Sequence, residues 1–289
     1  MPKACRFGGP TKANGNCTRP GDDGLPVQCV GAWAREKHDV LRRYVEATRS
    51  TRAKYLPPQP EPGGAAFIDL FAGPGRARVR GTNEVVDGSP LIAFKHGEQP
   101  FTKLVLCDVD AENVETLRRR TAGQPARAVV EHGDCNEIID KLVKRIPPHG
   151  LNLALIDPFS LGALRFGTVE KLARFKRMDL IVFFPVWQIR RFADVHRARY
   201  EPMLTNALGT DEWKGVLKRS PDAARLIPLF HRQLERRFGY TPENTYSAPI
   251  RISNQVALYH LVFASKHSRG DGIWESVTRR NRAGQARLF

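Results

Sequence analysis

The run from Phe67 to Gly75, FIDLFAGPG, constrains the fold of this chain more than any other stretch. A strand that is buried on both faces of a parallel sheet reads as a continuous apolar run, and this run ends in two glycines separated by one residue. Glycine allows the backbone to come close to a ligand. Because open α/β sheets bind ligands at the carboxyl ends of their strands, the turn predicts a binding site there.

Two familiar phosphate-binding motifs do not fit this turn. The GxGxxG fingerprint needs a glycine where Arg78 stands, and the P-loop needs GxxxxGK[ST]. The remaining pattern, D-x-F-x-G-x-G, resembles the first motif of class I S-adenosylmethionine-dependent methyltransferases. That resemblance implies that Phe71, Gly73 and Gly75 lie against the methionine part of the cofactor and that Asp69 lies near its ammonium. An ordinary strand–turn–helix unit is the alternative.

Regular alternation of strands and helices predicts the architecture. Apolar runs near residues 67–70, 103–107, 126–130, 151–156 and 180–184 are separated by helical patterns, and a helix is expected over 30–55. This order predicts a doubly wound, mostly parallel sheet of the Rossmann-like α/β class. Residues 187–238 predict a helical insertion, and residues 246–252 and 256–264 predict a C-terminal antiparallel strand pair.

The first 29 residues predict a separate, loosely ordered arm before a methyltransferase-like domain over 30–289. They contain Cys5, Cys17 and Cys29 without a CxxC pair, which favours reduced thiols. A zinc knuckle with His38 as fourth ligand is the alternative. No apolar run is long enough to cross a membrane, and no N-terminal apolar segment could act as a signal peptide, so we expect a cytoplasmic protein.

An excess of positive charge favours a polyanionic partner. The chain has 46 Lys and Arg residues against 30 Asp and Glu residues, a formal net charge of +16. Nucleic acid is the commonest such partner, because neutralising phosphates releases counterions. A solvated basic face is the alternative. The candidate contacts lie near the predicted ligand edge or at the start of the first helix: Lys37, His38, Arg76, Arg78, Arg190 and Arg191.

Acidic residues follow four of the predicted strands: Asp69, Asp108, Asp134 and Asp157. A carboxylate at the end of the second strand can accept hydrogen bonds from both ribose hydroxyls, so Asp108 is the candidate ribose ligand. Asp134 is then the candidate for the adenine amino group. Aspartate is also favoured at such positions as a helix cap, which is the alternative for each residue taken singly.

The sequence Asp157-Pro158-Phe159 gives the most specific indication of a substrate. It resembles the D-P-P-[YFW] motif of amino-directed nucleic-acid methyltransferases. In that motif the acid and a proline carbonyl accept hydrogen bonds from an exocyclic amine, and the aromatic ring stacks on the flipped base. Here Phe159 stands where the second proline would be. A tight turn after a buried strand is the alternative.

Several motifs in combination resemble the three-Cys-motif partner protein family over roughly residues 30–280: Lys37-His38 with Leu41 and Tyr44, Phe67 to Gly75, Gly88-Ser89-Pro90-Leu91, Ile156-Asp157-Pro158, and His260 to Ser265. This resemblance implies a class I methyltransferase-like fold, S-adenosylmethionine as cofactor, and a radical-SAM-like three-Cys partner protein. The cysteines in the family's name belong to that partner.

Together these patterns predict an S-adenosylmethionine-dependent methyltransferase that acts on nucleic acid, with the exocyclic amine of a base as the candidate methyl acceptor. A non-catalytic nucleic-acid-binding scaffold that assists a three-Cys partner is the first alternative. A metal-dependent, nuclease-like enzyme that uses the acids as Mg²⁺ ligands is the second, although acids at successive strand ends suit nucleoside recognition better.

Overall fold

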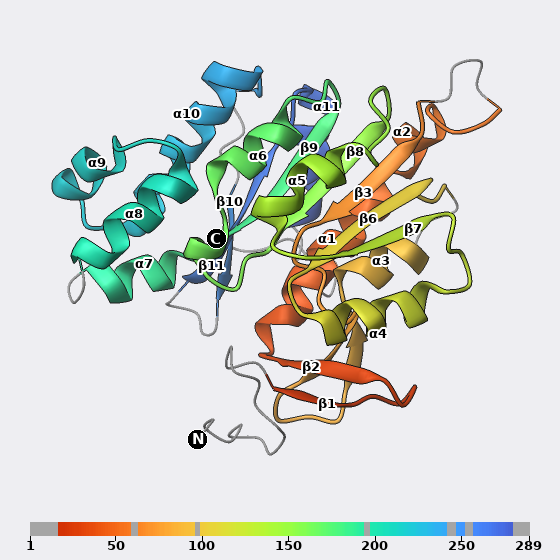
Figure 1. The fold of residues 1–289 in the computed structure, drawn as a ribbon. Coiled ribbons are helices and arrows are strands. Elements are labelled where there is room, and N and C mark those ends of the chain that lie inside the picture. Colours follow the sequence, from red (N-terminus) through yellow and green to blue (C-terminus); the bar gives the residue numbers. More distant parts are fainter. Residues whose placement is uncertain are drawn as a thin grey trace.

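A seven-stranded sheet forms the centre of the computed structural model, which describes residues 17–58, 63–95, 99–193, 197–241, 247–251 and 257–279 (Figure 1). Its strand order is β10-β11-β9-β8-β3-β6-β7. The five central and edge strands β3 (Ala65–Asp69), β6 (Lys103–Asp108), β7 (Ala128–His132), β8 (Leu151–Ile156) and β9 (Met178–Phe184) run parallel. The last two, β10 (Ser247–Arg251) and β11 (Ala257–Ala264), are antiparallel. The predicted Rossmann-like sheet with a C-terminal antiparallel pair is confirmed.

Helices cover both faces of this sheet because alternate strand residues point to opposite sides. Phe67, Leu153 and Ile181 belong to one buried cluster, whereas their neighbours Ile68 and Ala154 belong to the other. The first cluster is covered by α1 (Trp33–Ala47), α3 (Ser89–Lys95), α4 (Ala111–Thr121) and α11 (Ser268–Thr278). The second is covered by α5 (Cys135–Val143), α6 (Phe166–Ala173) and the helices that follow β9. A short helix α2 (Arg49–Ala53) follows α1.

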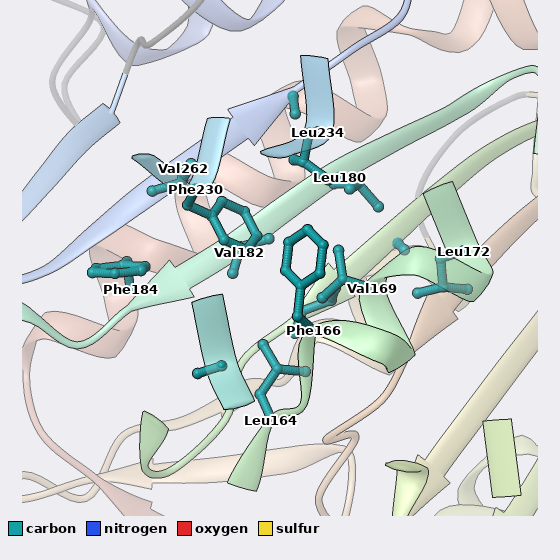
Figure 2. Close-up of a cluster of buried hydrophobic side chains, with 14 of the residues drawn as sticks. Leu164, Phe166, Val169, Leu172, Leu180, Val182, Phe184, Phe230, Leu234 and Val262 are labelled. Atoms are coloured by element: carbon teal, nitrogen blue, oxygen red, sulfur yellow. The ribbon is translucent and has the colours of Figure 1, made fainter. Parts of the chain in front are cut away.

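The segment after β9 is helical, as the sequence predicts. It contains α7 (Val186–Ala193), α8 (Arg197–Leu208), α9 (Trp213–Arg219), the short 3₁₀ helix η2 (Ala223–Arg225) and α10 (Leu226–Phe238). Phe230 of α10 packs edge-on against Phe166 at a ring separation of 5.8 Å and lies 6.3 Å from the ring of Phe184 (Figure 2). The segment is therefore joined to the sheet through a shared apolar core.

A second, smaller sheet corrects one sequence-based expectation. It has the order β1-β2-β4-β5, formed by β1 (Thr18–Pro20), β2 (Pro26–Val30), β4 (Arg76–Val79) and β5 (Val85–Asp87). Residues 17–29 are therefore not a loose arm, because β2 pairs with β1 and with β4, which follows the glycine turn. Cys5 lies outside the described residues. In Figure 1 this sheet lies beside α4, below the main sheet.

The strand order places a topological switch between β3 and β8. Strands β6 and β7 follow outward on one side of β3, and β8 and β9 follow on the other. The crevice outside the carboxyl ends at such a switch is where open α/β sheets bind ligands. Asp69 ends β3 and Asp157 follows β8, so these two acids flank the switch. None of the helices in the described ranges combines the length and apolar character that a membrane crossing requires.

Candidate functional site at the carboxyl edge of the sheet

The glycine turn after β3 has a backbone that only glycine adopts without strain. Gly73 has φ +60° and Gly75 has φ +87°. A Cβ on Gly75 would lie 2.8 Å from the side chain of Leu117, which is fully buried in α4. The turn therefore packs closely against α4, and its backbone at Gly75 is in the left-handed region. Both features exclude larger residues at Gly75.

Asp69 is fully buried at the start of this turn. Its Oδ1 accepts a hydrogen bond from the Phe71 backbone at 3.1 Å. Burial raises the pKa of Asp69 to about 7, and Asp157 adds to that rise, although the Ser89 hydroxyl, the Phe71 amide and Lys37 oppose it. The Ser89 hydroxyl lowers the pKa of Asp69 without forming a hydrogen bond of normal geometry. Oδ2 of Asp69 therefore accepts no hydrogen bond from the described residues. Asp69 thus holds one buried acceptor without a hydrogen bond beside the switch.

Asp108 connects the end of β6 to the glycine turn. Its Oδ2 accepts from the Gly73 backbone at 2.7 Å, and its Oδ1 accepts from the Asp110 backbone at 2.8 Å and from the Asn113 side chain at 3.1 Å. Burial raises the pKa of Asp108, and these three donors oppose the rise. A carboxylate has about four acceptor positions, so one position on Oδ2 remains for a ligand.

Asp134 is an exposed helix cap at the neighbouring strand end. Its Oδ1 accepts from the backbone and the side-chain amide of Asn136, both at 2.8 Å, at the start of α5. The capping alternative is therefore realised for this residue. The backbone amide of Gly133 also donates to the Asp108 carbonyl at 3.1 Å, which holds the two strand ends together.

Large exposed apolar side chains gather at this same edge. Val109, which follows Asp108, is 58% exposed, and Phe159, which follows the Asp157-Pro158 pair, is 61% exposed; no other large apolar side chain among the described residues is as open to solvent. Exposed apolar groups beside convergent polar groups are typical of ligand sites. Sequence reasoning singled out Phe159 but missed Val109.

Lys37 forms a salt bridge with Asp157 across the edge. Its Nζ lies 2.5 Å from Oδ2 of Asp157, and the lysine side chain is only 9% exposed. The ammonium also lies 5.3 Å from the ring centre of Trp33 and 4.9 Å from that of Phe183, which favours a cation on an aromatic face. Lys37 is therefore enclosed within the fold rather than presented to a phosphate.

His38, the neighbour of Lys37 on α1, has a neutral imidazole ring. Burial and the adjacent Lys37 hold the pKa of His38 well below its ordinary value. Its Nδ1 is buried and has no hydrogen-bond partner among the described residues. Cys17 and Cys29 are buried cysteines of the small sheet, and the described residues contain no cluster of three or more metal-ligating side chains.

Two amides that sequence reasoning missed hold the loop that carries Phe159. Gln188 of α7 donates to the Phe159 carbonyl at 3.0 Å and accepts from the Leu161 amide at 3.1 Å. Asn136 of α5 donates to the Ala163 carbonyl at 2.9 Å. The loop, which includes the 3₁₀ helix η1 (Leu161–Ala163), is thereby fixed between the helical insertion and α5.

Arg120 joins the small sheet to the glycine turn, and it too was missed. Its side chain is 4% exposed and binds Asp23 at 2.9 Å. The same guanidinium donates to the carbonyls of Pro26 and Pro74 at 2.9 and 2.6 Å. The oxygen of the Gln28 side chain lies 3.3 Å from where a Cβ on Gly73 would be. Residues 17–30 are therefore part of the site's surroundings.

The arginines that sequence reasoning proposed as nucleic-acid contacts occupy different settings. Arg76 forms ion pairs with Asp22, Asp23 and Asp87. Arg190 pairs with Asp222 at 2.9 Å. Arg78 is half-buried on β4, and Arg191 lies on α7 with its side chain outside the described part.

No family model matches this chain, and no curated protein matches it. Solved structures with a similar fold include a Legionella pneumophila protein of the family DUF519, at 12% identity and a TM-score of 0.46, covering 83% of this chain and 91% of that one. The CurJ carbon methyltransferase has 14% identity and a TM-score of 0.39, with 78% and 54% covered. The DszA carbon methyltransferase has 15% identity and a TM-score of 0.39, with 75% and 50% covered.

Proposed function

We propose that the carboxyl edge of the main sheet binds S-adenosylmethionine and that the protein transfers its methyl group to nucleic acid. The observation that carries this proposal is the convergence, around one left-handed glycine turn, of acceptor carboxylates with an exposed apolar side chain. When bound, the cofactor would supply a methyl group attached to a sulfonium sulfur. The rest of the cofactor would leave as a neutral thioether once the methyl group is transferred. The protein's task is then to bind and align rather than to form covalent bonds.

The carboxylates at this edge can accept hydrogen bonds from the polar groups of the cofactor. The cofactor's ammonium, ribose hydroxyls and adenine amino group are all hydrogen-bond donors. The unsatisfied Oδ2 of Asp69 suits the ammonium. Asp108 retains room for one ribose hydroxyl rather than two, because Gly73 already occupies Oδ2 once. Asp134 suits the adenine amino group, and Val109 offers an apolar contact for the ring.

The substrate half of the proposal rests on Asp157, Pro158 and Phe159. An exposed aromatic ring beside a cofactor site offers a stacking surface for an unpaired base. Lys37 holds Oδ2 of Asp157, which fixes the carboxylate and leaves Oδ1 to accept from an amine. The net charge of +16 adds sequence-independent attraction for a polyanion.

Methyl transfer from tritiated S-adenosylmethionine tests this function. Single- and double-stranded DNA and RNA would be offered to the parent protein, to Phe159→Ala and to the control Glu115→Ala, an exposed residue of α4. We expect the parent and the control to label at least one nucleic acid, and Phe159→Ala to lose about tenfold or more, since a stacked base contributes about 1–3 kcal/mol. Absence of label in every nucleic acid with the parent protein would overturn the proposal.

The Lys37–Asp157 salt bridge favours one second candidate function. Because the lysine occupies one oxygen of the motif's acid, the protein can instead be a non-catalytic scaffold that holds nucleic acid for a radical-SAM-like three-Cys partner. This candidate predicts nucleic-acid binding by the parent protein without methyl transfer. The same assay, combined with a binding titration, separates the two functions.

A further inference from the structure

The small sheet contains a concavity lined by three arginines. Its volume is about 270 Å³, and its walls include Arg19 of β1, Arg78 of β4 and Arg80, with Cys29 and the turn residues Thr82 and Asn83. None of the described residues that line it is acidic. The next acid along the chain, Glu84, is bound to Arg35.

Strand geometry explains how these side chains meet. In the described register Cys29 lies opposite Arg78, and Arg19 lies opposite Val27 of the same strand as Cys29, so that Arg19 and Arg78 share a face with Cys29. Arg80, just beyond β4, donates to the Cys29 carbonyl at 3.2 Å. Pairing thus gathers positive charge that is spread over some sixty residues of sequence.

Two arginines of β4 differ sharply in their partners. Arg76 is matched by three aspartates. Arg78, two residues later on the same face, forms no ion pair with the described residues, although both arginines have a buried Nε without a hydrogen-bond partner there. A guanidinium whose charge no acid matches attracts an anionic ligand. An arginine presents planar paired donors that suit phosphate oxygens.

We propose that this concavity binds a phosphate group of a nucleic-acid backbone and holds the substrate at a second point, outside the carboxyl edge. The inference rests on the proposed function for the identity of the polyanion. Strand β4 leaves the glycine turn directly, and Arg80 is five residues beyond Gly75, or about 16 Å along an extended chain. A nucleic acid that reaches the carboxyl edge can therefore extend to this concavity.

Fluorescence anisotropy with labelled oligonucleotides of about twenty nucleotides, titrated at several salt concentrations, tests the proposal. The variants are Arg78→Gln and the exposed Arg80→Gln, and the matched control is Arg145→Gln, an exposed arginine beyond α5. We expect each test variant to weaken binding about tenfold and to lower the slope of log Kd against log salt by about one, with a smaller change in the control. Thermal melting verifies folding, and Arg80→Gln decides if Arg78→Gln does not fold.

Equal affinities of both test variants and the control would overturn the proposal. A titration with inorganic phosphate or adenosine monophosphate gives a second way to overturn it. If the parent protein binds either compound and Arg78→Gln does not, while both bind the oligonucleotide equally, the ligand of the concavity is a small phosphorylated molecule. Calorimetry with S-adenosylhomocysteine keeps the two proposals apart. Failure of the phosphate site leaves that binding intact in every variant, whereas failure of the cofactor site removes it from the parent protein.

Discussion

Binding of S-adenosylhomocysteine should strengthen as the pH rises through the pKa of Asp69. That pKa is about 7 because the carboxyl group is fully buried, and the ligand's ammonium should bind only the ionised form. The ionised fraction is about one-tenth at pH 6 and about nine-tenths at pH 8, so the apparent Kd should fall about tenfold between them. Isothermal titration at both pH values, in buffers of different ionisation enthalpy, should also detect proton release on binding.

The Asp69→Asn variant is the control for this prediction. It should bind weakly at both pH values, and its affinity should not change with pH. Its fold should be at least as stable as the parent's at pH 8, since the raised pKa means that ionisation of Asp69 opposes folding as the pH rises, by as much as about 4 kcal/mol. An apparent Kd of the parent protein that is flat from pH 6 to 8 would refute the contact between Asp69 and the ammonium.

Three further predictions concern polar residues around the site and in the helical insertion. Arg120→Leu removes one of the two arginines that pair with Asp23 and leaves three backbone carbonyls without its hydrogen bonds, so denaturant titration should find a loss of about 2 kcal/mol or more; an unchanged midpoint would contradict this. His231 is a buried residue of α10; burial lowers its pKa to about 4, and neither ring nitrogen has a partner among the described residues. The unfolded chain therefore binds the proton first, stability should fall as the pH drops from about 6.5 toward 4, and thermal melts of His231→Leu should show a smaller fall. Gln188→Ala should speed hydrogen exchange at the Leu161 amide with little change in Tm, and unchanged exchange would argue against its role in holding the loop.

Local patterns predict the main sheet well and the small sheet not at all. The strands Leu151–Ile156 and Met178–Phe184 are nearly continuous apolar runs because both of their faces are buried. Strands β1 and β4 are three and four residues long, and half of β4 is arginine. The pairing of Gln28 with Ala77 joins residues far apart in sequence, and no local periodicity reports it.

The candidate site divides in the same way. The glycine turn and the acids at the strand ends can be predicted because each lies directly after a strand. The salt bridge between Lys37 and Asp157 cannot, because 120 residues separate its partners. Arg120 and Gln188 are single polar residues on amphipathic helices. Nothing in the sequence distinguishes a polar side chain that hydrogen-bonds a distant segment from one that is solvated.

Calorimetric titration of the unmodified protein with S-adenosylhomocysteine at about pH 8 tests the central claim most directly. Val109→Glu alters a side chain that is 58% exposed, so it should leave the fold intact while placing a charge where the adenine is expected. Glu115→Gln, on the neighbouring helix, is the control. We predict one-site binding by the parent protein and by Glu115→Gln, and its loss in Val109→Glu. No heat of binding with the parent protein, or equal binding by Val109→Glu, would contradict the assignment of this edge as a cofactor site.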